Sequence, residues 1–333
     1  MVKSEPDSGS WAVITGASSG IGAALAYQLA ERGYATVLVA RRVDRLEALA
    51  GRIRNDFATE VAVIPCDLAD RVQREGLCAD LASRSVAVLC NNAGFAVCGE
   101  IADTDQRAQR SVVQVNVVAV QELTLAVLPG MLARRSGAIL ITGSISGVQP
   151  VPTAATYAAS KAFVNSYAEA LHVELDGTGV HCTLLSPGPV RTEFYRVGGV
   201  SAERENSYAA ISTDRVARAG LTALFGARRT VTPGRTAQLQ AWGGRTIPRR
   251  LLFPALRRLV LPWLRAGLVD SNTRRSANVQ YRSAATVARR GSDGGRSLAR
   301  ATTPVGQQHR GHRRAGRSGA GPESAAADDV PAE

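Results

Sequence analysis

The sequence has few aromatic residues, almost no lysine and no closely paired cysteines, and each shortage excludes something. Aromatic residues make up 5% of the 333 residues, so the core has to be built from alanine, valine, leucine and isoleucine. The five cysteines are odd in number and include no C-x-x-C pair, which argues against a disulfide framework and against a zinc site. We therefore expect reduced, largely buried thiols, no bound metal and a cytoplasmic protein.

Long apolar runs are also absent. The first ten residues are polar, so we expect no secretory signal. No uninterrupted apolar run reaches the roughly 20 residues of an ordinary membrane-spanning helix.

The net charge of +12 is unevenly distributed along the chain. Residues 1–227 contain 20 basic and 22 acidic residues, whereas residues 228–282 contain 12 arginines and one acidic residue. The main body is therefore near neutral, and the basic charge belongs to a C-terminal segment. This segment has no basic strand interleaved with aromatic residues, so we expect no nucleic-acid binding.

Short apolar runs alternate with helix-length segments through the first 190 residues. The runs are continuous, which is typical of strands buried on both faces of a parallel sheet. Strand–helix alternation predicts right-handed crossovers and an α/β fold with a doubly wound parallel sheet. The expected strands are 11–15, 35–40, 61–66, 86–90, 138–143, 180–185 and 229–233. The expected helices are 20–32, 43–57, 70–84, 103–129, 155–176 and 213–225.

A glycine-rich turn follows the first expected strand and opens the first expected helix. Glycines at such a turn let a pyrophosphate approach the backbone N–H groups of a helix N-terminus. We therefore predict that this turn binds a dinucleotide. The residues concerned are Thr15, Gly16, Ser18, Gly20, Ile21 and Gly22.

The end of the second strand indicates which dinucleotide is bound. An acidic residue there would bind the ribose 2′-hydroxyl of NAD(H), but Arg41 and Arg42 occupy the position. Because guanidinium groups pair with phosphate, they favour NADP(H), with Ser18 as a further donor. Later strand ends complete the expected cofactor site: Asp67 and Leu68 at the adenine, then Asn92, Ala93 and Gly94.

Tyr157 and Lys161 are the strongest candidates for chemistry. Their i,i+4 spacing places them on one face of a helix. A phenol, with an ordinary pKa near 10, is a poor base until a nearby ammonium favours the phenolate. Lys161 is one of only two lysines among 40 basic residues, which suggests a role that arginine does not fill. Ser144 follows the fifth strand, where its hydroxyl can hold a substrate carbonyl oxygen.

Six motifs in order resemble the short-chain dehydrogenase/reductase superfamily: TGASSGIG (15–22), NNAG (91–94), Asn116, Ser144, YAASK (157–161) and PGPVRTEF (187–194). The resemblance covers about residues 10–235 and implies a single Rossmann-type catalytic domain. It implies that Asn116, Ser144, Tyr157 and Lys161 form a catalytic tetrad, with Asn116 supporting a proton relay through water to Lys161. It also implies that Pro187, Gly188, Val190 and Thr192 border the nicotinamide.

Within the superfamily the sequence is most similar to actinobacterial ketoacyl reductases, including the mycolate-reductase-like group, through segments 123–131, 155–171 and 179–194. This similarity implies hydride transfer from NADPH to a 3-oxo group of a fatty-acyl or lipid substrate, with Tyr157 donating the proton. Two alternatives stay open. One is a dehydrogenase of a steroid or another bulky secondary alcohol, and the other is a non-catalytic NADP-binding scaffold.

Residues 236–282 form a basic amphipathic C-terminal extension. On a helical projection Leu252, Leu256, Leu259, Val260 and Trp263 face away from Arg250, Arg257, Arg258 and Arg265, with an interruption or kink expected at Pro262. Segment 245–269 either packs on the body or on a partner, or it contacts the inner face of a membrane or lines an acyl-chain pocket.

The two ends of the chain are expected to be tails. Residues 1–9 form the N-terminal one, and residues 283–333, which are rich in Gly, Ala, Arg and Ser, are predicted to be disordered. The oligomeric state stays open. The superfamily often assembles through its long helices, but the amphipathic C-terminal segment could block one of those faces.

Overall fold

The structure is a computed structural model that describes residues 9–199, 210–266 and 268. All of these residues belong to one compact unit. The expected tail 283–333, nearly all of tail 1–9 and segment 269–282 of the extension lie outside the described residues. The predictions made for these residues therefore stay predictions.

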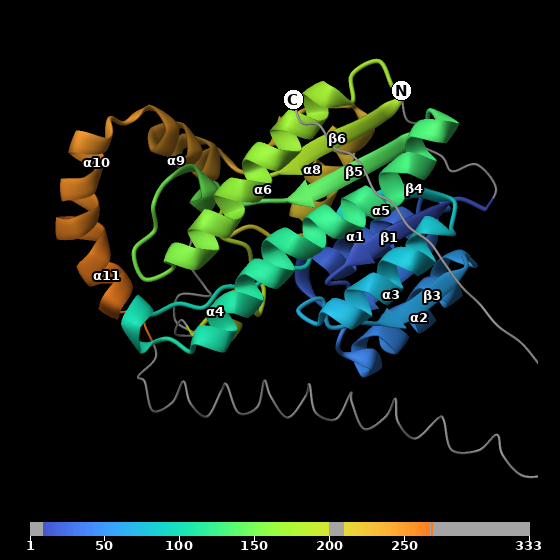
Figure 1. Ribbon diagram of the computed structural model, residues 1–333, viewed down its shortest axis with the longest axis horizontal. Coiled ribbons are helices and arrows are strands. Elements are labelled where there is room, and N and C mark those ends of the chain that lie inside the picture. Colours follow the sequence, from blue (N-terminus) through green and yellow to red (C-terminus); the bar gives the residue numbers. More distant parts are fainter. Residues whose placement is uncertain (1–8, 200–209, 267, 269–333) are drawn as a thin grey trace, which may run out of the picture. The chain divides into compact units, whose positions relative to one another are not determined.

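A seven-stranded parallel sheet forms the centre of the fold, which confirms the expected doubly wound α/β architecture (Figure 1). The strand order is β3-β2-β1-β4-β5-β6-β7. The strands are β1 (Trp11–Thr15), β2 (Ala35–Ala40), β3 (Val61–Pro65), β4 (Val86–Asn91), β5 (Gly137–Thr142), β6 (Val180–Leu185) and β7 (Thr230–Val231). Each lies within a residue or two of its expected range, because a short continuous apolar run is typical of a strand that is buried on both faces of a parallel sheet.

Helices cover both faces of the sheet and divide the core into two apolar layers. One layer packs α1 (Gly20–Ala30), α2 (Val43–Phe57) and α8 (Thr213–Phe225) on the sheet. The opposite layer contains α3 (Arg71–Ala82), α5 (Ala119–Arg134) and α6 (Ala155–Glu174). These layers are almost entirely aliphatic, as the scarcity of aromatics requires, and all five cysteines are free thiols.

The expected helix 103–129 is more irregular than its pattern indicated. It divides into a 3-10 turn, η1 (Ile101–Asp103), then α4 (Gln106–Val113), a π-helical turn (Gln114–Val118) and α5. Gln106–Arg134 is long and apolar enough to span a membrane by length and composition, which the sequence analysis did not expect. It lies against the sheet, and its Val112, Leu123 and Met131 are buried in this fold.

The strand order reverses between β1 and β4, the kind of position where open parallel sheets bind their ligands. Four short segments follow strand ends on this side: the glycine turn after β1, the turn after β4, a 3-10 turn η3 (Ile145–Val148) after β5, and α7 (Phe194–Val197) after β6. This edge is where the candidate site residues gather.

Residues 235–266, which we call the C-terminal arm, form α9 (Arg235–Thr246), α10 (Arg249–Ala255), a π-helical turn (Leu256–Val260) and α11 (Leu261–Ala266). The expected interruption near Pro262 takes the form of that π-helical turn, which ends at Val260, two residues before the proline. Proline has no N–H for the preceding turn, so an irregular hydrogen-bond pattern is expected there.

Candidate functional site

The glycine turn after β1 has a backbone that other residues would not allow. Gly16 and Gly20 adopt φ values of +71° and +60°. A Cβ on Gly22 would overlap the Gly16 carbonyl oxygen and would lie 2.6 Å from Nδ2 of Asn92. The turn leads directly into α1, whose first N–H groups have no acceptor within the helix, as a pyrophosphate site requires.

Thr15 and Asn92 hold the ends of β1 and β4 together. The Thr15 hydroxyl accepts from the backbone N–H groups of Asn92 and Ala93, at 3.0 Å each. Nδ2 of Asn92 donates back to the Thr15 carbonyl at 3.0 Å. These two predicted cofactor residues thus lie beside the glycine turn, and the hydrogen bonds of their side chains fix its shape.

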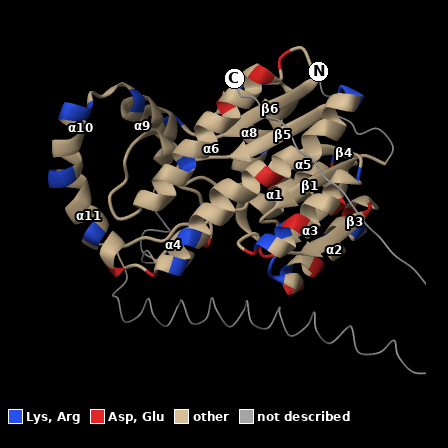
Figure 2. Cartoon of the chain, viewed as in Figure 1, with Lys and Arg blue, Asp and Glu red and all other residues tan. Residues whose placement is uncertain are grey.

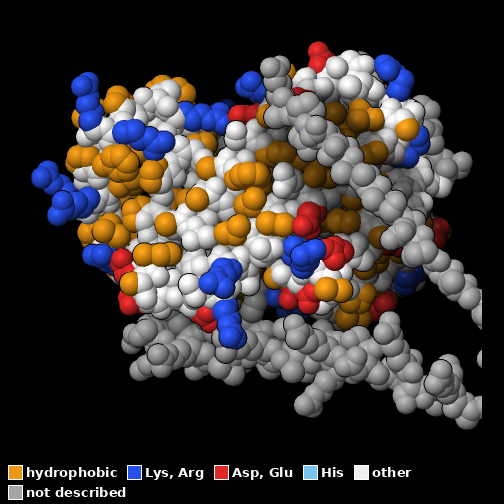
Figure 3. Space-filling model, viewed as in Figure 1, with side chains coloured by type: hydrophobic (Ala, Val, Ile, Leu, Met, Phe, Trp, Pro, Cys, Tyr) orange, Lys and Arg blue, Asp and Glu red, His pale blue; other side chains and the backbone are white. Residues whose placement is uncertain are grey.

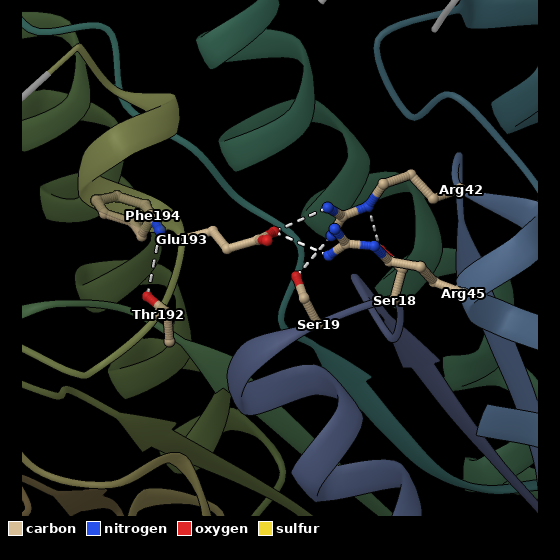
Figure 4. Close-up of polar contacts among 7 residues, drawn as sticks. All are labelled: Ser18, Ser19, Arg42, Arg45, Thr192, Glu193 and Phe194. Atoms are coloured by element: carbon tan, nitrogen blue, oxygen red, sulfur yellow. Dashed lines mark hydrogen bonds and ion pairs between the residues drawn. The ribbon is translucent and has the colours of Figure 1, made fainter. Parts of the chain in front are cut away.

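An arginine and serine cluster lies at the end of β2 (Figure 4). Arg42 donates to the hydroxyls of Ser18, from Nε at 3.2 Å and from Nη2 at 3.0 Å, and of Ser19, from Nη2 at 2.7 Å. Its Nη1 contacts Oε2 of Glu193 at 2.8 Å, and Nη1 of Arg45 contacts the same oxygen at 3.0 Å. Hydrogen bonds from Arg42 and then Arg45 lower the pKa of Glu193 to about 2, so this carboxyl is ionised near neutral pH.

Lys161 is buried, with 4% of its surface exposed, and its Nζ donates to the Thr142 carbonyl at 2.7 Å. Burial lowers the pKa of Lys161 to about 8, because the apolar surroundings disfavour the charged form. Its Nζ lies 5.9 Å from the centre of the Tyr157 ring. A Cβ on Gly94 would lie 3.3 Å from this nitrogen, so the NNAG turn borders the ammonium.

Ser144 caps the 3-10 turn η3, and its Oγ accepts from the N–H of Ser146 at 3.0 Å. Asn165, one turn beyond Lys161 on α6, donates from Nδ2 to the Ser144 carbonyl at 3.0 Å. A Cβ on Gly147 would lie 2.6 Å from the Lys161 carbonyl oxygen, so η3 packs directly on α6. The Ser144 turn is thereby fixed against the helix that carries Tyr157 and Lys161.

Asn116 is fully buried within the π-helical turn, an irregularity that is frequent at functional sites. Its Nδ2 donates to the Phe95 carbonyl at 3.0 Å and to Oγ of Ser160 at 2.9 Å. Its Oδ1 accepts from the Phe95 N–H at 3.1 Å. The side chain therefore joins the segment after β4 to α6, next to Lys161.

Of the remaining predicted cofactor residues, some contact the segments that form the site, and the others have local contacts, are buried or lie at the surface. Thr192 lies against the glycine turn, since a Cβ on Gly20 would be 3.1 Å from its methyl carbon. The Pro187 carbonyl accepts from the N–H of Ile145, and Gly188 faces Ala237 of α9. The other residues are Ile21, Arg41, Asp67, Leu68 and Val190.

Among these other residues, Oδ1 of Asp67 accepts from the N–H of Ala69 at 3.0 Å. Leu68 and Val190 are buried. Ile21 is partly buried against the core, and Arg41 is exposed at the end of β2.

Sequence reasoning missed Ser19, Arg45, Asn165 and Glu193. A helical signal for Asn165 was present, because it follows Lys161 by four residues and shares its face. Glu193 and Arg45 are 148 positions apart, and no local pattern connects them.

The comparisons with known proteins show the family to which the chain belongs. The profile of the family described as "short chain dehydrogenase" matches residues 10–198. The chain therefore belongs to the short-chain dehydrogenase family, a class of NAD(P)-dependent oxidoreductases that act on CH–OH and C=O groups.

Two curated relatives are very-long-chain 3-oxoacyl-CoA reductases. The one from Anas platyrhynchos is 34% identical over 205 residues, covering 60% of this chain and 65% of the relative. The one from Bos taurus is 35% identical over 194 residues, covering 57% and 62%. The match thus spans less than two thirds of either relative.

Two solved structures share the fold. A short-chain dehydrogenase from Sphingobium yanoikuyae in complex with NADPH has a TM-score of 0.66 at 30% identity, covering 75% of this chain and 96% of that one. A bulky-bulky ketone specific alcohol dehydrogenase from Comamonas testosteroni has a TM-score of 0.62 at 27% identity, covering 75% and 95%.

Proposed function

We propose that the protein is an NADP(H)-dependent reductase of a 3-oxo group on a fatty-acyl or lipid substrate. The observation that carries the chemistry is the buried Lys161 ammonium beside Tyr157, on the helix against which the Ser144 turn packs. The 3-oxoacyl part is supported by the names of the curated relatives. We also propose residues 10–235 as the catalytic domain and 236–282 as its extension.

The residues fit NADP(H) on structural grounds. Gly16 and Gly22 pack closely on Asn92, Ala93 and the backbone of the turn itself, which keeps the turn tight in front of the N-terminus of α1, where a pyrophosphate would bind. At the end of β2, Arg42 and Arg45 converge on one carboxylate, which shows that this place accommodates an anion. A 2′-phosphate needs the same donors. The NADPH complex of the Sphingobium yanoikuyae relative supports this assignment.

Each of the four proposed catalytic residues would have its own role in the reduction of the carbonyl group. When bound, NADPH supplies the hydride. Tyr157 donates a proton to the carbonyl oxygen of the substrate, and the Lys161 ammonium stabilises the phenolate that remains. The Ser144 hydroxyl already accepts from Ser146, so its own hydrogen is available to the same substrate oxygen. Asn116 keeps the Lys161 side of the site rigid through its bonds to Phe95 and Ser160.

The test follows NADPH absorbance with the purified full chain and 3-oxoacyl thioesters of graded length, bulky ketones and steroid ketones. Tyr157→Phe should lower turnover by about 100-fold or more, as expected for loss of a general acid, and should still bind the dinucleotide. Tyr27→Phe, which removes an exposed hydroxyl bonded to Asp56, is the matched control and should behave as wild type.

The panel also distinguishes the alternatives. Turnover of bulky ketones without 3-oxoacyl thioesters would favour the secondary-alcohol dehydrogenase, which the Comamonas testosteroni relative supports. Dinucleotide binding with no turnover of any substrate would favour the scaffold. Unchanged turnover in Tyr157→Phe would exclude the proposed acid.

We further propose that the C-terminal arm contacts an anionic membrane at its cytoplasmic face. Leu239, Trp242, Leu251, Phe253, Leu259 and Trp263 are exposed, and the exposed arginines of α10 and its continuation lie beside them (Figures 2 and 3). Large exposed apolar side chains mixed with arginine are typical of helices that lie in a membrane interface.

Flotation of the full chain with vesicles containing phosphatidylglycerol tests this contact. The double variant Leu259→Ser/Trp263→Ser should lose most of its flotation, and Val72→Ser, an equally exposed position on α3, should not. Equal flotation of the three proteins would contradict the proposal.

A homo-oligomer through α5 and α6 is also proposed, because Leu125, Phe163 and Val173 are exposed on these helices. Light scattering after size-exclusion chromatography tests it, and a monomeric mass at micromolar concentration would contradict it.

A further inference from the structure

Glu193 forms ion pairs with Arg42 and Arg45, the two groups proposed above as donors to a 2′-phosphate. One carboxylate oxygen accepts from Arg42 at 2.8 Å and from Arg45 at 3.0 Å, and Arg42 is held in position by the hydroxyls of Ser18 and Ser19 (Figure 4). Two guanidinium groups that converge on one anion, with two hydroxyls bonded to one of them, are donors that suit a phosphate. In this structure a residue of the chain itself supplies the anion.

The segment that contains Glu193 also reaches both other parts of the site. Its preceding residue, Thr192, lies against Gly20 of the glycine turn. Its following residue, Phe194, has its ring centre 5.3 Å from that of Tyr157. Glu193 thus links the start of α7 to Arg42 at the end of β2, and the ring of Phe194 contacts that of Tyr157.

We propose that Glu193 competes with the 2′-phosphate of NADP(H) for Arg42 and Arg45, and that its displacement moves Phe194 away from Tyr157. The inference rests on the proposed NADP(H) function. It makes Glu193 a residue that sets how strongly the 2′-phosphate is preferred, and it couples cofactor binding to access to Tyr157. A cofactor without the 2′-phosphate leaves the ion pair intact.

The balance of charges favours displacement. The side chains of Arg42, Arg45 and Glu193 are 35%, 42% and 31% exposed, so a ligand reaches the guanidinium groups from solvent. Partly exposed ion pairs are weak, and a phosphate carries more negative charge than a carboxylate. The phosphate therefore replaces Glu193, at the expense of part of its own binding free energy.

Calorimetric titration with adenosine 2′,5′-bisphosphate and with adenosine 5′-monophosphate tests the competition without any turnover. Glu193→Gln should bind the bisphosphate about fivefold more tightly than wild type, since it removes a competing ion pair. Its affinity for the monophosphate should stay unchanged. The control is Glu75→Gln, which removes an exposed ion pair with Arg71 on α3 and should alter neither affinity.

Hydrogen exchange of the wild-type protein tests the displacement. The N–H groups of Val197 and Gly198 donate to the carbonyls of Glu193 and Phe194, so they report on the first turn of α7. The bisphosphate should speed their exchange, and the monophosphate should not.

The results separate failure of the inference from failure of the proposed function. Equal wild-type affinity for the two nucleotides would remove the 2′-phosphate site and with it the NADP(H) assignment. A wild-type preference for the bisphosphate that Glu193→Gln leaves unchanged or weakens would overturn the competition alone. Exchange at Val197 and Gly198 that is unaltered or slowed by the bisphosphate would overturn the displacement.

Discussion

The sheet and the C-terminal arm treat apolar and charged side chains in opposite ways. In the sheet, β1, β4 and β5 bury nearly every side chain, and Lys161 and Asn165, which are polar side chains buried beside them, have hydrogen-bond partners. In the arm, Leu259 and Trp263 are 72% and 60% exposed next to exposed arginines. Packing within the monomer explains the buried sheet, but it does not explain why the arm exposes large apolar side chains.

The difference shows that two kinds of constraint act on one chain. Burial and hydrogen bonding inside the monomer determine the sheet and its site. The arm carries large apolar side chains whose free energy improves only when something else covers them. Variants in the sheet should therefore affect folding and chemistry, whereas variants on the outer face of the arm should affect association.

Gly22→Ala should have the largest effect. The added Cβ would overlap the Gly16 carbonyl oxygen and press on Asn92, so we expect a loss of about 3 kcal/mol in the free energy of unfolding, together with loss of dinucleotide binding. Gly51→Ala is the control, because nothing lies within 4 Å of its Cβ and it is inside α2. This control should stabilise the protein by about 0.5–1 kcal/mol. Urea unfolding measures both, and equal values would contradict the close packing of the turn.

Asn165→Ala should have the next largest effect. Removing the amide takes one of two donors from the Ser144 carbonyl, which keeps the Gly147 N–H, and it takes the acceptor from the buried Ser144 N–H. Losing these bonds costs about 1–3 kcal/mol. Because the Ser144 turn also loosens, kcat should fall while affinity for adenosine 2′,5′-bisphosphate stays the same. Asn55→Ala, at an exposed position on α2, is the control and should leave kcat unchanged without lowering the stability. A loss of stability with unchanged kcat would limit Asn165 to a structural role.

The pH dependence of reduction should reflect the burial of Lys161. Its pKa is lowered to about 8, so the ammonium is lost as the pH rises through that value. Since the proposed mechanism uses the ammonium, kcat at saturating NADPH should fall about tenfold per pH unit well above this point. Stability has the opposite sign: the cost of burying the charge is full below about pH 8 and shrinks toward the ordinary value of 10.5.

Lys161→Arg is the control for this profile, because a guanidinium keeps its charge at high pH. The variant should be slower but should show no fall beginning near pH 8. The same fall in both proteins would assign the titration to another group.

The sequence predicted the sheet and its strand ends better than it predicted the C-terminal arm. The sheet strands were predicted almost to the residue, because each is a continuous apolar run between two helical segments. The position of Ser144 was predictable because it follows the end of β5, and those of Tyr157 and Lys161 because their i,i+4 spacing places them on one face of a helix. Their catalytic roles remain proposals.

Long-range and irregular features were not predictable. The ion pair of Arg45 with Glu193 joins residues 148 positions apart, and only the folded chain brings them together. The π-helical turn around Asn116 was also missed, because its residues continue the apolar pattern of an ordinary helix. In the arm the helical projection placed Leu252, Leu256, Leu259 and Trp263 on one side, yet the first two are buried and the last two are exposed.

The smallest effect on stability is expected for Leu259→Ala in the arm, and Leu256→Ala is the variant to compare with it. Leu256 and Leu259 lie in the same π-helical turn, but Leu256 is 6% exposed and Leu259 is 72% exposed. Leu256→Ala should cost about 2 kcal/mol in the free energy of unfolding, and Leu259→Ala should change it by less than about 0.5 kcal/mol. Urea unfolding without lipid measures both. If the two variants cost equally little, the arm does not pack through Leu256, and its whole apolar surface is available for association.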